Sequence, residues 1–453
     1  MSERATASGM FSGSESSTRI RLGLLLGVGV LGALVFVFQD VVPARLRSSI
    51  GVVCFLGVAI ACSANLQKIR WQTVAWGLGL QLSLAVLILR VDIGGIRPGY
   101  ELFSLLATVM TRFLEFTNVG SEFVFGVLAN EEIMREVFPN GLVLAFAALP
   151  IIIFVSSVFA VLYHLGVMQY LVGAMARVMM PLMRTSGAET LSAAANVFMG
   201  QTEAPLVVRP FIASMTRSEL LTLMVGGLAT IAGSMFGVYV RLGADPVAML
   251  TTSVMAAPCG LYLSKILMPE TTEPTTTGRV AVAVDDTHVN VIDAAAGGAA
   301  DGMRLAINVA AMLIAFLAFV AMIDHVLGLV SSGLTLARVF SIVFAPVASL
   351  VGVSSADVPA VADLLGTKLV TNEFVAYLKL GTEYGGELSP RSHTLATFAL
   401  TGFANFGSLG VILGGIGAIA PTRRADLARL ASRALLGGFF ATLINAAIAG
   451  VLI

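Results

Sequence analysis

Long apolar runs limit what this chain can fold into more than any other feature of the sequence. Ten of these runs are close to the ~20 residues that a helix needs to cross ~30 Å of hydrocarbon, and we expect them to be membrane spans. Charged residues make up only 12% of the chain, about half of the roughly 25% usual in soluble domains, which excludes a water-soluble globule. The predicted spans are Leu22–Phe38, Ile50–Ala64, Trp71–Val91, Leu142–His164, Leu220–Val240, Pro246–Met268, Leu305–Met322, Leu336–Val351, Thr394–Ile419 and Ala434–Ile453.

Charge and cysteine content exclude other classes of protein. The 27 basic and 27 acidic residues balance to a formal net charge of zero, so the chain has no polycationic surface for nucleic acid. The three cysteines, Cys54, Cys62 and Cys259, lie in apolar runs without CxxC spacing. They support neither a disulfide framework nor a zinc site, and we expect them to be small core residues.

Basic residues beside the spans predict the orientation of the chain in the membrane. If the chain crosses fully nine times, Ile453 lies outside and one predicted span must fold back. Leu336–Val351, which is short and contains Pro346, is the best candidate for that span. Arg45 and Arg47 would then face outward, which counts against this arrangement. The residues expected on the cytoplasmic side are Arg19, Arg21, Lys68, Arg70, Arg423, Arg424 and Arg429.

Two stretches between the spans differ in character. Residues 101–138 mix charged and apolar residues, and in Leu102–Leu114 the apolar ones recur at helical spacing. This predicts a helix lying along the membrane surface, with a soluble loop as the alternative. Glu270–Asp301 is hydrophilic and rich in Thr, Asp and Gly, so we expect a solvent loop that separates the chain into two halves.

Each half contains one segment that is too polar to cross lipid as a plain helix. We call Thr185–Phe211, which contains Glu203, hairpin 1, and Asp357–Leu380, which contains Glu373, hairpin 2. Pro205 prevents a continuous helix just after Glu203, because proline has no amide hydrogen and clashes with the preceding turn. A re-entrant hairpin resolves this conflict, since irregular backbone is tolerated at membrane depth where it lines a cavity.

Matching interruptions in two halves predict a transporter with internal repeats, whose binding site lies where the broken ends meet. An ionisable group at such depth costs at least ~2.5 kcal/mol on insertion scales, so Glu203 and Glu373 need a compensating role. Ligand binding is one such role. The alternative is that each glutamate pairs with a nearby cation, such as Arg209 or Lys379.

Two glycine-rich stretches predict broken helices. Gly226–Gly237 and Gly402–Gly415 are dense in glycine, and each glycine lowers helix stability by about 1 kcal/mol relative to alanine. Close helix packing through small residues is the alternative explanation. Thr230, Asn405 and Ser408 within or beside the glycines favour a break, because they can contact a ligand.

Taken in order, these motifs resemble those of the concentrative nucleoside transporters. The similarity extends from about Ile50 to the C-terminus. The segments that carry it are Leu191–Asn196, Gly200–Leu206, Thr230–Ser234, Pro269–Thr271, Asn372–Tyr377, Gly402–Phe406 and Ala420–Arg424.

The resemblance implies an all-α polytopic membrane protein with internal inverted repeats, two re-entrant helical hairpins and two unwound transmembrane helices. The implied activity is secondary active symport that imports nucleosides across the bacterial inner membrane, driven by sodium or protons, with elevator-type alternating access. A homotrimer embedded in membrane lipid, in which a transport domain slides against a scaffold, is the implied assembly. No enzyme activity is implied.

The resemblance also implies roles for particular residues. In the substrate site, the nucleobase faces Gln201, Thr202 and Glu203, with Met235 beside it. The ribose hydroxyls are held by Glu373, Asn405 and Ser408, and Phe403 packs beside the sugar. In the Na+ site, the ligands are the side chains of Asn196 and Thr230 and the backbone carbonyls of Met199 and Ile231. These neutral oxygen ligands suit sodium, a hard cation, and favour it over a proton as the coupling ion.

Two departures from the family pattern concern base preference. Met235 replaces a smaller branched residue, and Gly407 replaces a serine often found before Ser408. Gly200 and Gln201 resemble the broad-specificity members, so both purine and pyrimidine nucleosides are expected.

The resemblance divides the chain into a scaffold and a transport domain. The run at Leu22–Phe38 has no cleavage site after it, so we expect it to be retained as an extra helix. The expected parts are a cytoplasmic tail (1–19), the extra transmembrane helix (20–40), scaffold helices with an interfacial helix (46–140), a scaffold helix with the first half of the transport domain and hairpin 1 (141–270), a hydrophilic loop (271–302), a scaffold helix (303–335) and the second half of the transport domain with hairpin 2 (336–453).

Three other functions compete with sodium symport. A proton-coupled carrier would need a titratable group, but His164, His288, His325 and His393 all lie at predicted helix ends or loops. A channel would use the same polar residues to line a continuous pore. A membrane-embedded enzyme would use the two glutamates as acid and base, but no HExxH or GxSxG motif accompanies them.

Overall fold

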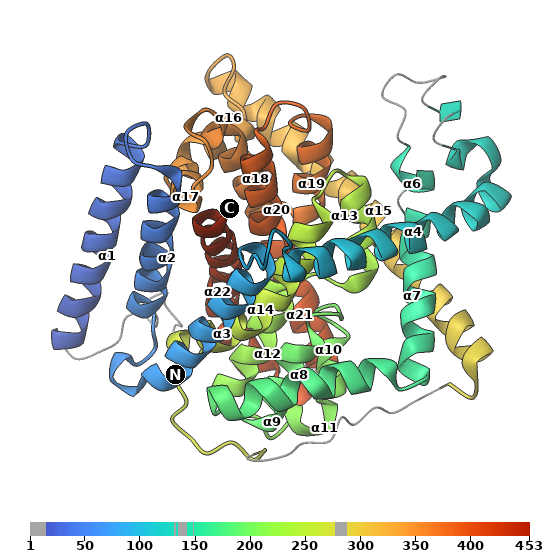
Figure 1. Ribbon diagram of the computed structural model, residues 1–453, viewed down its shortest axis with the longest axis horizontal. Coiled ribbons are helices and arrows are strands. Elements are labelled where there is room, and N and C mark those ends of the chain that lie inside the picture. Colours follow the sequence, from blue (N-terminus) through green and yellow to red (C-terminus); the bar gives the residue numbers. More distant parts are fainter. Residues whose placement is uncertain (1–14, 131–132, 135–142, 148, 277–287) are drawn as a thin grey trace, which may run out of the picture.

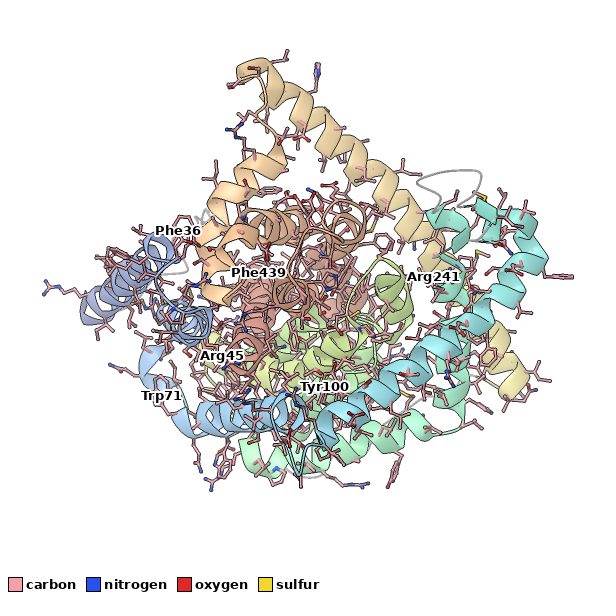
Figure 2. The ribbon with its side chains drawn as sticks, turned by 45° about the horizontal axis from the view of Figure 1, so that its top comes forward. Phe36, Arg45, Trp71, Tyr100, Arg241 and Phe439 are labelled. Atoms are coloured by element: carbon pink, nitrogen blue, oxygen red, sulfur yellow. The ribbon has the colours of Figure 1, made fainter. Side chains whose placement is uncertain are left out.

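The computed structural model describes residues 15–130, 133–134, 143–147, 149–276 and 288–453. Within these ranges the regular structure is helical, apart from one isolated bridge between Ile93 and Ile96. The predicted all-α class is therefore confirmed. Helices from both halves of the chain pack around a common centre, in which Phe439 lies, while Trp71 lies at the periphery (Figure 1, Figure 2).

Seven helices of the described chain are long and apolar enough to cross a membrane. Each contains or overlaps one predicted span. An eighth span results if α7 (Leu149–His164) and α8 (Val167–Met183), which are bent by 74° relative to each other, count as one. The seven are α1 (Glu15–Val37), α2 (Ala44–Ala61), α3 (Trp71–Leu89), α12 with α13 (Arg217–Ala229 and Gly233–Arg241), α14 (Pro246–Leu267), α15 (Val291–Val330) and α22 (Arg424–Leu452).

The remaining helices are shorter or lie outside the predicted spans. They are α4 (Pro98–Phe125), α6 (Leu144–Ala147), α9 (Gly187–Ala195), α10 (Ala204–Val207), α11 (Arg209–Ile212), α16 (Leu336–Val343), α17 (Ala345–Val351), α18 (Val358–Val370), α19 (Glu373–Thr382), α20 (Pro390–Leu400) and α21 (Phe406–Ile419).

Three predicted spans are interrupted: Leu220–Val240 divides into α12 and α13, and the other two are Leu336–Val351 and Thr394–Ile419. The nine crossings stay a prediction. Leu336–Val351 divides at Phe344 into α16 and α17, because Pro346 has no amide hydrogen for the turn before it. Thr394–Ile419 divides into α20 and α21. Leu142–His164 contains α6 and α7, and residues 142 and 148 lie outside the described chain.

Helix α4 runs across the bundle at a steep angle to α1 and α2 (Figure 1). It covers much of residues 101–138, so the alternative of a soluble loop is wrong as far as Phe125. Apolar side chains project from it: Phe123 is 91% exposed and Val119 is 73% exposed. Such exposure suits a helix whose apolar side meets lipid, as the surface-helix prediction requires.

Helix α15 is longer than expected and corrects the predicted loop. It begins at Val291 after Asn290, whose side chain accepts a hydrogen bond from the amide of Asp293 at 2.9 Å. Residues 291–302, which we expected in the hydrophilic loop of 271–302, are therefore helical. Gly298 and Gly302 of this stretch pack against α7: a Cβ on Gly298 would lie 2.7 Å from the carbonyl oxygen of Ser156. Glycine there permits close helix packing rather than a turn.

Both hairpins have the expected form of a helix, a break and a second helical part. In hairpin 1, α9 begins with a capping box between Ser186 and Glu189, and Pro205 lies at the start of α10. In hairpin 2, α18 is followed by α19, which Asn372 caps. Helix α9 packs against α12 and α14, and α18 packs against α16, α17 and α20, so the hairpins lie inside the bundle.

Arginines at the end of the molecule near Ile453 bind carbonyl oxygens at helix ends. The Nε of Arg45 donates to the carbonyl oxygen of Ile453 at 3.1 Å, and Nη2 of Arg47 donates to that of Val353 at 2.8 Å. Arg391 also donates to the carbonyl of Ile453. These cations satisfy the negative ends of helices. Arg45 and Arg47 therefore have a structural role at this end of the molecule.

Candidate functional site

Both predicted unwound helices are broken, and the breaks meet. The first break is Thr230–Ala232, between α12 and α13, and the second is Thr401–Asn405, between α20 and α21. The amide of Phe403 donates to the carbonyl oxygen of Thr230 at 3.1 Å. A direct backbone hydrogen bond therefore joins the two halves of the chain at their irregular segments.

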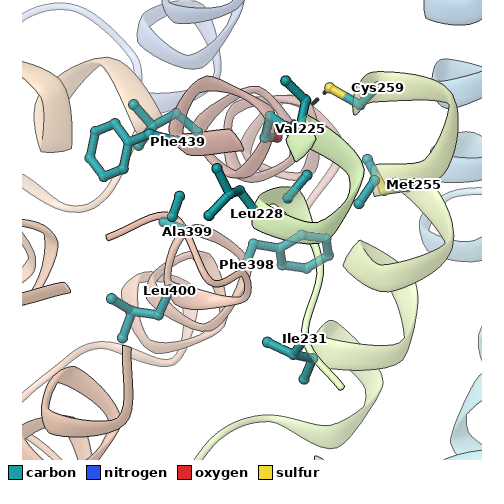
Figure 3. Close-up of a cluster of buried hydrophobic side chains, with 14 of the residues drawn as sticks. Val225, Leu228, Ile231, Met255, Cys259, Phe398, Ala399, Leu400 and Phe439 are labelled. Carbon is teal, nitrogen blue, oxygen red and sulfur yellow. Dashed lines mark hydrogen bonds between the residues drawn. The ribbon is translucent and has the colours of Figure 1, made fainter. Parts of the chain in front are cut away.

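Gly402 permits this close approach. Its φ is +135°, a conformation that side chains disfavour, and a Cβ there would lie 3.0 Å from the carbonyl oxygen of Ala229. Figure 3 shows Leu228 of α12 beside Phe398 and Ala399 of α20 in an apolar cluster that also includes Ile231 of the first break. The broken backbone therefore rests on a packed core.

Glu373 lies at the start of α19 and is only 5% exposed. Its Oε1 accepts a hydrogen bond from the Tyr239 hydroxyl at 2.8 Å, and its Oε2 accepts one from Nδ2 of Asn405 at 2.8 Å. The alternative that Glu373 pairs with Lys379 is wrong, because Lys379 pairs with Asp363. The carboxylate is thus oriented by neutral donors and keeps acceptor capacity for a ligand.

Tyr239 is a site residue that the sequence analysis missed. It lies in α13, one turn after Met235, and it stacks on Tyr377 with ring centroids 4.6 Å apart. Both tyrosines are fully buried. A buried tyrosine hydroxyl usually finds a hydrogen-bond partner, so a tyrosine in the glycine-broken span was a usable signal. Its partner lies in the other half of the chain and could not be inferred.

Asparagines cap the helices that restart after each interruption in the second half. Oδ1 of Asn405 accepts from the amide of Ser408 at 2.8 Å, and Oδ1 of Asn372 accepts from the amide of Val375 at 2.9 Å. Because capping uses Oδ1 of Asn405, its Nδ2 is left to donate to Glu373. The positive N-terminal end of α19 also favours the negative charge of Glu373.

The tip of hairpin 1 is more open. Thr202 and Glu203 are exposed on the isolated chain, and Gln201 is partly buried with its Oε1 lacking a hydrogen-bond partner. Oε2 of Glu203 accepts from the amide of Gly200 at 3.1 Å, within the same turn. No ion pair joins Glu203 to Arg209 among the described residues, so the pairing alternative fails here too.

Packing contacts show which helices the hairpin 1 tip lies against. A Cβ added to Gly227 would lie 2.9 Å from Cβ of Gln201, and one added to Gly415 would lie 3.3 Å from Cγ2 of Thr202. The tip therefore lies between α12 and α21. Met235 is buried in the first turn of α13.

The four predicted sodium ligands lie around the first break. Asn196 is 1% exposed, and its Nδ2 donates to the carbonyl of Ser192 while its Oδ1 has no hydrogen-bond partner. Thr230 donates to the carbonyl of Gly226 at 3.0 Å, which leaves the lone pairs of its hydroxyl free. Met199 and Ile231 lie on two chain segments that a hydrogen bond from the amide of Gly233 to the carbonyl of Phe198 joins at 3.0 Å.

This donor set fits a monovalent hard cation. The unpartnered, buried amide oxygen of Asn196 and the hydroxyl of Thr230 are neutral oxygen ligands of the kind that sodium accepts. Within the described ranges no cluster of three or more His, Cys, Asp or Glu residues could hold a transition metal. The two proposed sites are connected, since the break that contains Thr230 also accepts the hydrogen bond from Phe403.

Comparisons with known proteins cover nearly the whole chain. Residues 50–128 match the family model for the N-terminus of Na+ dependent nucleoside transporters, residues 145–246 match a nucleoside recognition (Gate) model, and residues 248–450 match the C-terminus of Na+ dependent nucleoside transporters. The chain is 41% identical to sodium/nucleoside cotransporter 1 of Mus musculus over 456 residues, which is 96% of this chain and 68% of that protein.

Two further matches cover almost the full length of the matched protein. An uncharacterized transporter of Haemophilus influenzae is 40% identical over 418 residues, which is 90% of this chain and 98% of that protein. The structure of CNTnw in an inward-facing, substrate-bound state superimposes with a TM-score of 0.85 at 40% identity, covering 90% of this chain and 98% of that chain.

Proposed function

This chain belongs to the Na+-dependent nucleoside transporter family, and we propose that it imports nucleosides across the bacterial inner membrane by symport with sodium ions. Glu373 supports this proposal best: it is a buried carboxylate, oriented by Tyr239 and Asn405 where two broken helices meet. Burial of an ionisable group is costly in a membrane protein, and such groups mark substrate pathways.

The second half of the site holds the ribose. Glu373 accepts hydrogen bonds from the paired ribose hydroxyls on the lone pairs that Tyr239 and Asn405 leave free. Ser408 adds a hydroxyl at the start of α21, and Phe403 packs beside the sugar. Because the carboxylate is already oriented, little side-chain freedom is lost on binding.

The tip of hairpin 1 holds the nucleobase. The unpartnered Oε1 of Gln201 accepts from a base amino group, and Thr202 and Glu203 reach the base edge from the same turn. Met235 forms the apolar wall. Amide and hydroxyl groups both donate and accept, so this edge suits purine and pyrimidine nucleosides alike.

Sodium couples to substrate through the hairpin 1 tip. Asn196 and Thr230 supply side-chain oxygens, and Met199 and Ile231 supply backbone carbonyls. Bound sodium orders the segment that leads to Gln201, and so raises the affinity for the nucleoside; by linkage, nucleoside raises the affinity for sodium by the same factor.

Transport then requires the site to face each side of the membrane in turn. The hairpins and broken helices move as one transport domain against a scaffold that includes α15, in a homotrimer. The exposed apolar side chains of α15, such as Ile314 at 73% and Phe319 at 54%, meet the neighbouring subunits or membrane lipid in this arrangement.

Uptake of radiolabelled uridine into a strain without its own nucleoside transport tests the proposal. Expressed protein should accumulate uridine above the external concentration in a sodium gradient, and replacing sodium with choline at constant pH should abolish accumulation. Equilibration without accumulation would indicate a channel instead. Uptake that a proton gradient drives in choline would indicate proton coupling. Uridine recovered in chemically altered form would indicate an enzyme.

A thermal-shift assay on the purified protein separates ligand class from transport. A ligand that binds only the folded state raises the unfolding temperature by mass action. Nucleosides should raise it in sodium and have little effect in choline. Free ribose and free nucleobases are the matched controls, because each occupies only one side of the proposed site. A shift caused equally by an unrelated sugar would contradict nucleoside recognition.

A further inference from the structure

Lys368 is fully buried in hairpin 2, and the function proposed above leaves it without a role. It lies in the last turns of α18. Its Nζ donates to the carbonyl oxygen of Ala399 at 2.8 Å and to Oγ1 of Thr442 at 2.9 Å. The ammonium also lies 5.6 Å from the ring centroid of Phe439, within the range of a cation–π interaction.

Two other lysines, Lys265 of α14 and Lys379 of hairpin 2, are paired with carboxylates. Lys265 lies 2.5 Å from Glu189, at the base of hairpin 1, and Lys379 pairs with Asp363 in hairpin 2. Lys368 has no such ion pair among the described residues. A buried ammonium without one is costly unless its other partners compensate, so its three neutral contacts need an explanation.

The contact with Ala399 supplies a hydrogen bond that the second break removes. In a continuous helix the amide of Phe403 would donate to the carbonyl of Ala399, four residues earlier. Here that amide donates to the carbonyl of Thr230 instead. Lys368 therefore occupies the position of the missing donor, at the negative C-terminal end of α20.

Lys368 also brings a charge close to the substrate site. Thr442 touches the second break, since a Cβ on Gly402 would lie 2.7 Å from Cγ2 of Thr442. The ammonium thus joins α18, α20 and α22 at the break from which Asn405 reaches Glu373.

The first half has the same order of elements, a hairpin followed by a broken helix, but no lysine at its break. The C-terminal end of α12 there lies beside Asn196, whose Oδ1 is unpartnered, and Thr230. In that half the proposed cation is a sodium ion. At both breaks the end of a half-helix attracts a cation. The cation is the proposed sodium ion at the first break and the Lys368 ammonium at the second.

We propose that Lys368 is a tethered cation that takes, at the second break, the place that the exchangeable sodium ion takes at the first. Lys368 is a positioning residue: it touches no substrate but stabilises the break from which Asn405 reaches Glu373. This inference rests on the proposed function. It implies one sodium ion per nucleoside, because the second cation position is occupied by the chain itself.

Sodium titrations of Lys368→Ala test the proposal. The wild type should show a Hill coefficient for sodium of about 1, and the variant, whose ammonium is replaced by space among oxygen atoms, should show one of about 2 with uptake recovered only at high sodium. Sodium-induced thermal stabilisation of the purified variant should rise over the same range. Lys379→Ala is the matched control and should keep a coefficient of about 1.

Each other result overturns the proposal. A wild-type coefficient of about 2 would mean that the second position is not occupied. An unchanged sodium response in Lys368→Ala would mean that the ammonium has no cation role, and a folded variant inactive at every sodium concentration would mean that sodium cannot replace it. If Lys368→Ala does not fold, Thr442→Val decides, because it removes one acceptor of Nζ at similar volume: wild-type nucleoside affinity in that variant overturns the proposal. Failure of the wild type to take up uridine with sodium would instead overturn the proposed function.

Discussion

Glu373 in hairpin 2 is buried and accepts hydrogen bonds from Tyr239 and Asn405, which come from two other helical segments. Glu203 in hairpin 1 is exposed on the isolated chain and accepts one hydrogen bond, from the backbone of its own turn. The amide of Gln201 beside it has an unpartnered oxygen. Glu373 is thus oriented before any ligand binds, whereas Glu203 belongs to a segment that has an unpartnered polar group.

This difference indicates how the two halves divide the work of binding. An oriented group loses little freedom on binding and contributes more of its interaction to affinity. A segment with unsatisfied polar groups gains order when a ligand arrives, which makes it the place where sodium and substrate can influence each other. The ribose side is preorganised, and the base side is where coupling occurs.

Among these variants, Glu373→Gln should cause the largest loss of uridine transport. A smaller loss would contradict the difference between the two hairpins. The amide can accept from only one of Tyr239 and Asn405, and hydrogen bonds to charged groups contribute about 1.5–3 kcal/mol each. We expect kcat/KM for uridine uptake to fall by at least about 100-fold. Glu383→Gln, an exposed carboxylate just beyond hairpin 2, is the control and should transport normally. Uptake within about threefold of wild type would remove Glu373 as the ribose anchor.

Asn196→Ala should act on sodium and leave substrate recognition intact. Loss of one of the few side-chain ligands should raise the half-saturating sodium concentration by roughly 30-fold, equivalent to about 2 kcal/mol. Nucleoside affinity at saturating sodium should stay near the wild-type value. Asn445→Ala removes a different buried asparagine, which bonds to Thr252, and should leave the sodium dependence unchanged. Equal effects of the two substitutions would point to general destabilisation.

Tyr239→Phe measures how much the orientation of Glu373 contributes. It removes one donor to the carboxylate and keeps the ring stacked on Tyr377, so we expect nucleoside affinity to fall by about tenfold. Tyr262→Phe is the matched control, because that hydroxyl donates to Gln81 at 2.8 Å in a buried cluster away from the site. Both variants should lose some thermal stability. A change in affinity in the control alone would contradict the assignment.

Glu203→Gln should have the smallest effect, since an exposed carboxylate with one hydrogen bond contributes little orientation. We expect about a threefold loss in affinity, and the loss should differ between adenosine and uridine because the group faces the base. Competition assays with the two nucleosides provide the measurement. A loss as large as that of Glu373→Gln, equal for both nucleosides, would mean that the two hairpins are equivalent.

Much of the fold could be predicted from features that act along the chain. Apolar runs predicted the seven long helices, Pro205 and Pro346 predicted interruptions, and glycine density predicted the breaks at Thr230–Ala232 and Thr401–Asn405. The family predicted from the motifs is confirmed by relatives that cover nearly the whole chain. Proline and glycine act on their own backbone, so their effects are local and legible in sequence.

Other features came from contacts between distant residues. The start of α15 at Val291 was missed because glycines that looked like loop residues pack against α7. Tyr239 and Glu373 are 134 positions apart, and neither residue alone indicates the other. Hydropathy, proline and glycine determined that two halves would each bring a broken helix and a polar hairpin into the membrane. Only the packing of those halves decided which donors face Glu373 and which carbonyl Lys368 completes, because hydrogen-bond partners depend on distances of a few ångströms that the order of residues does not contain.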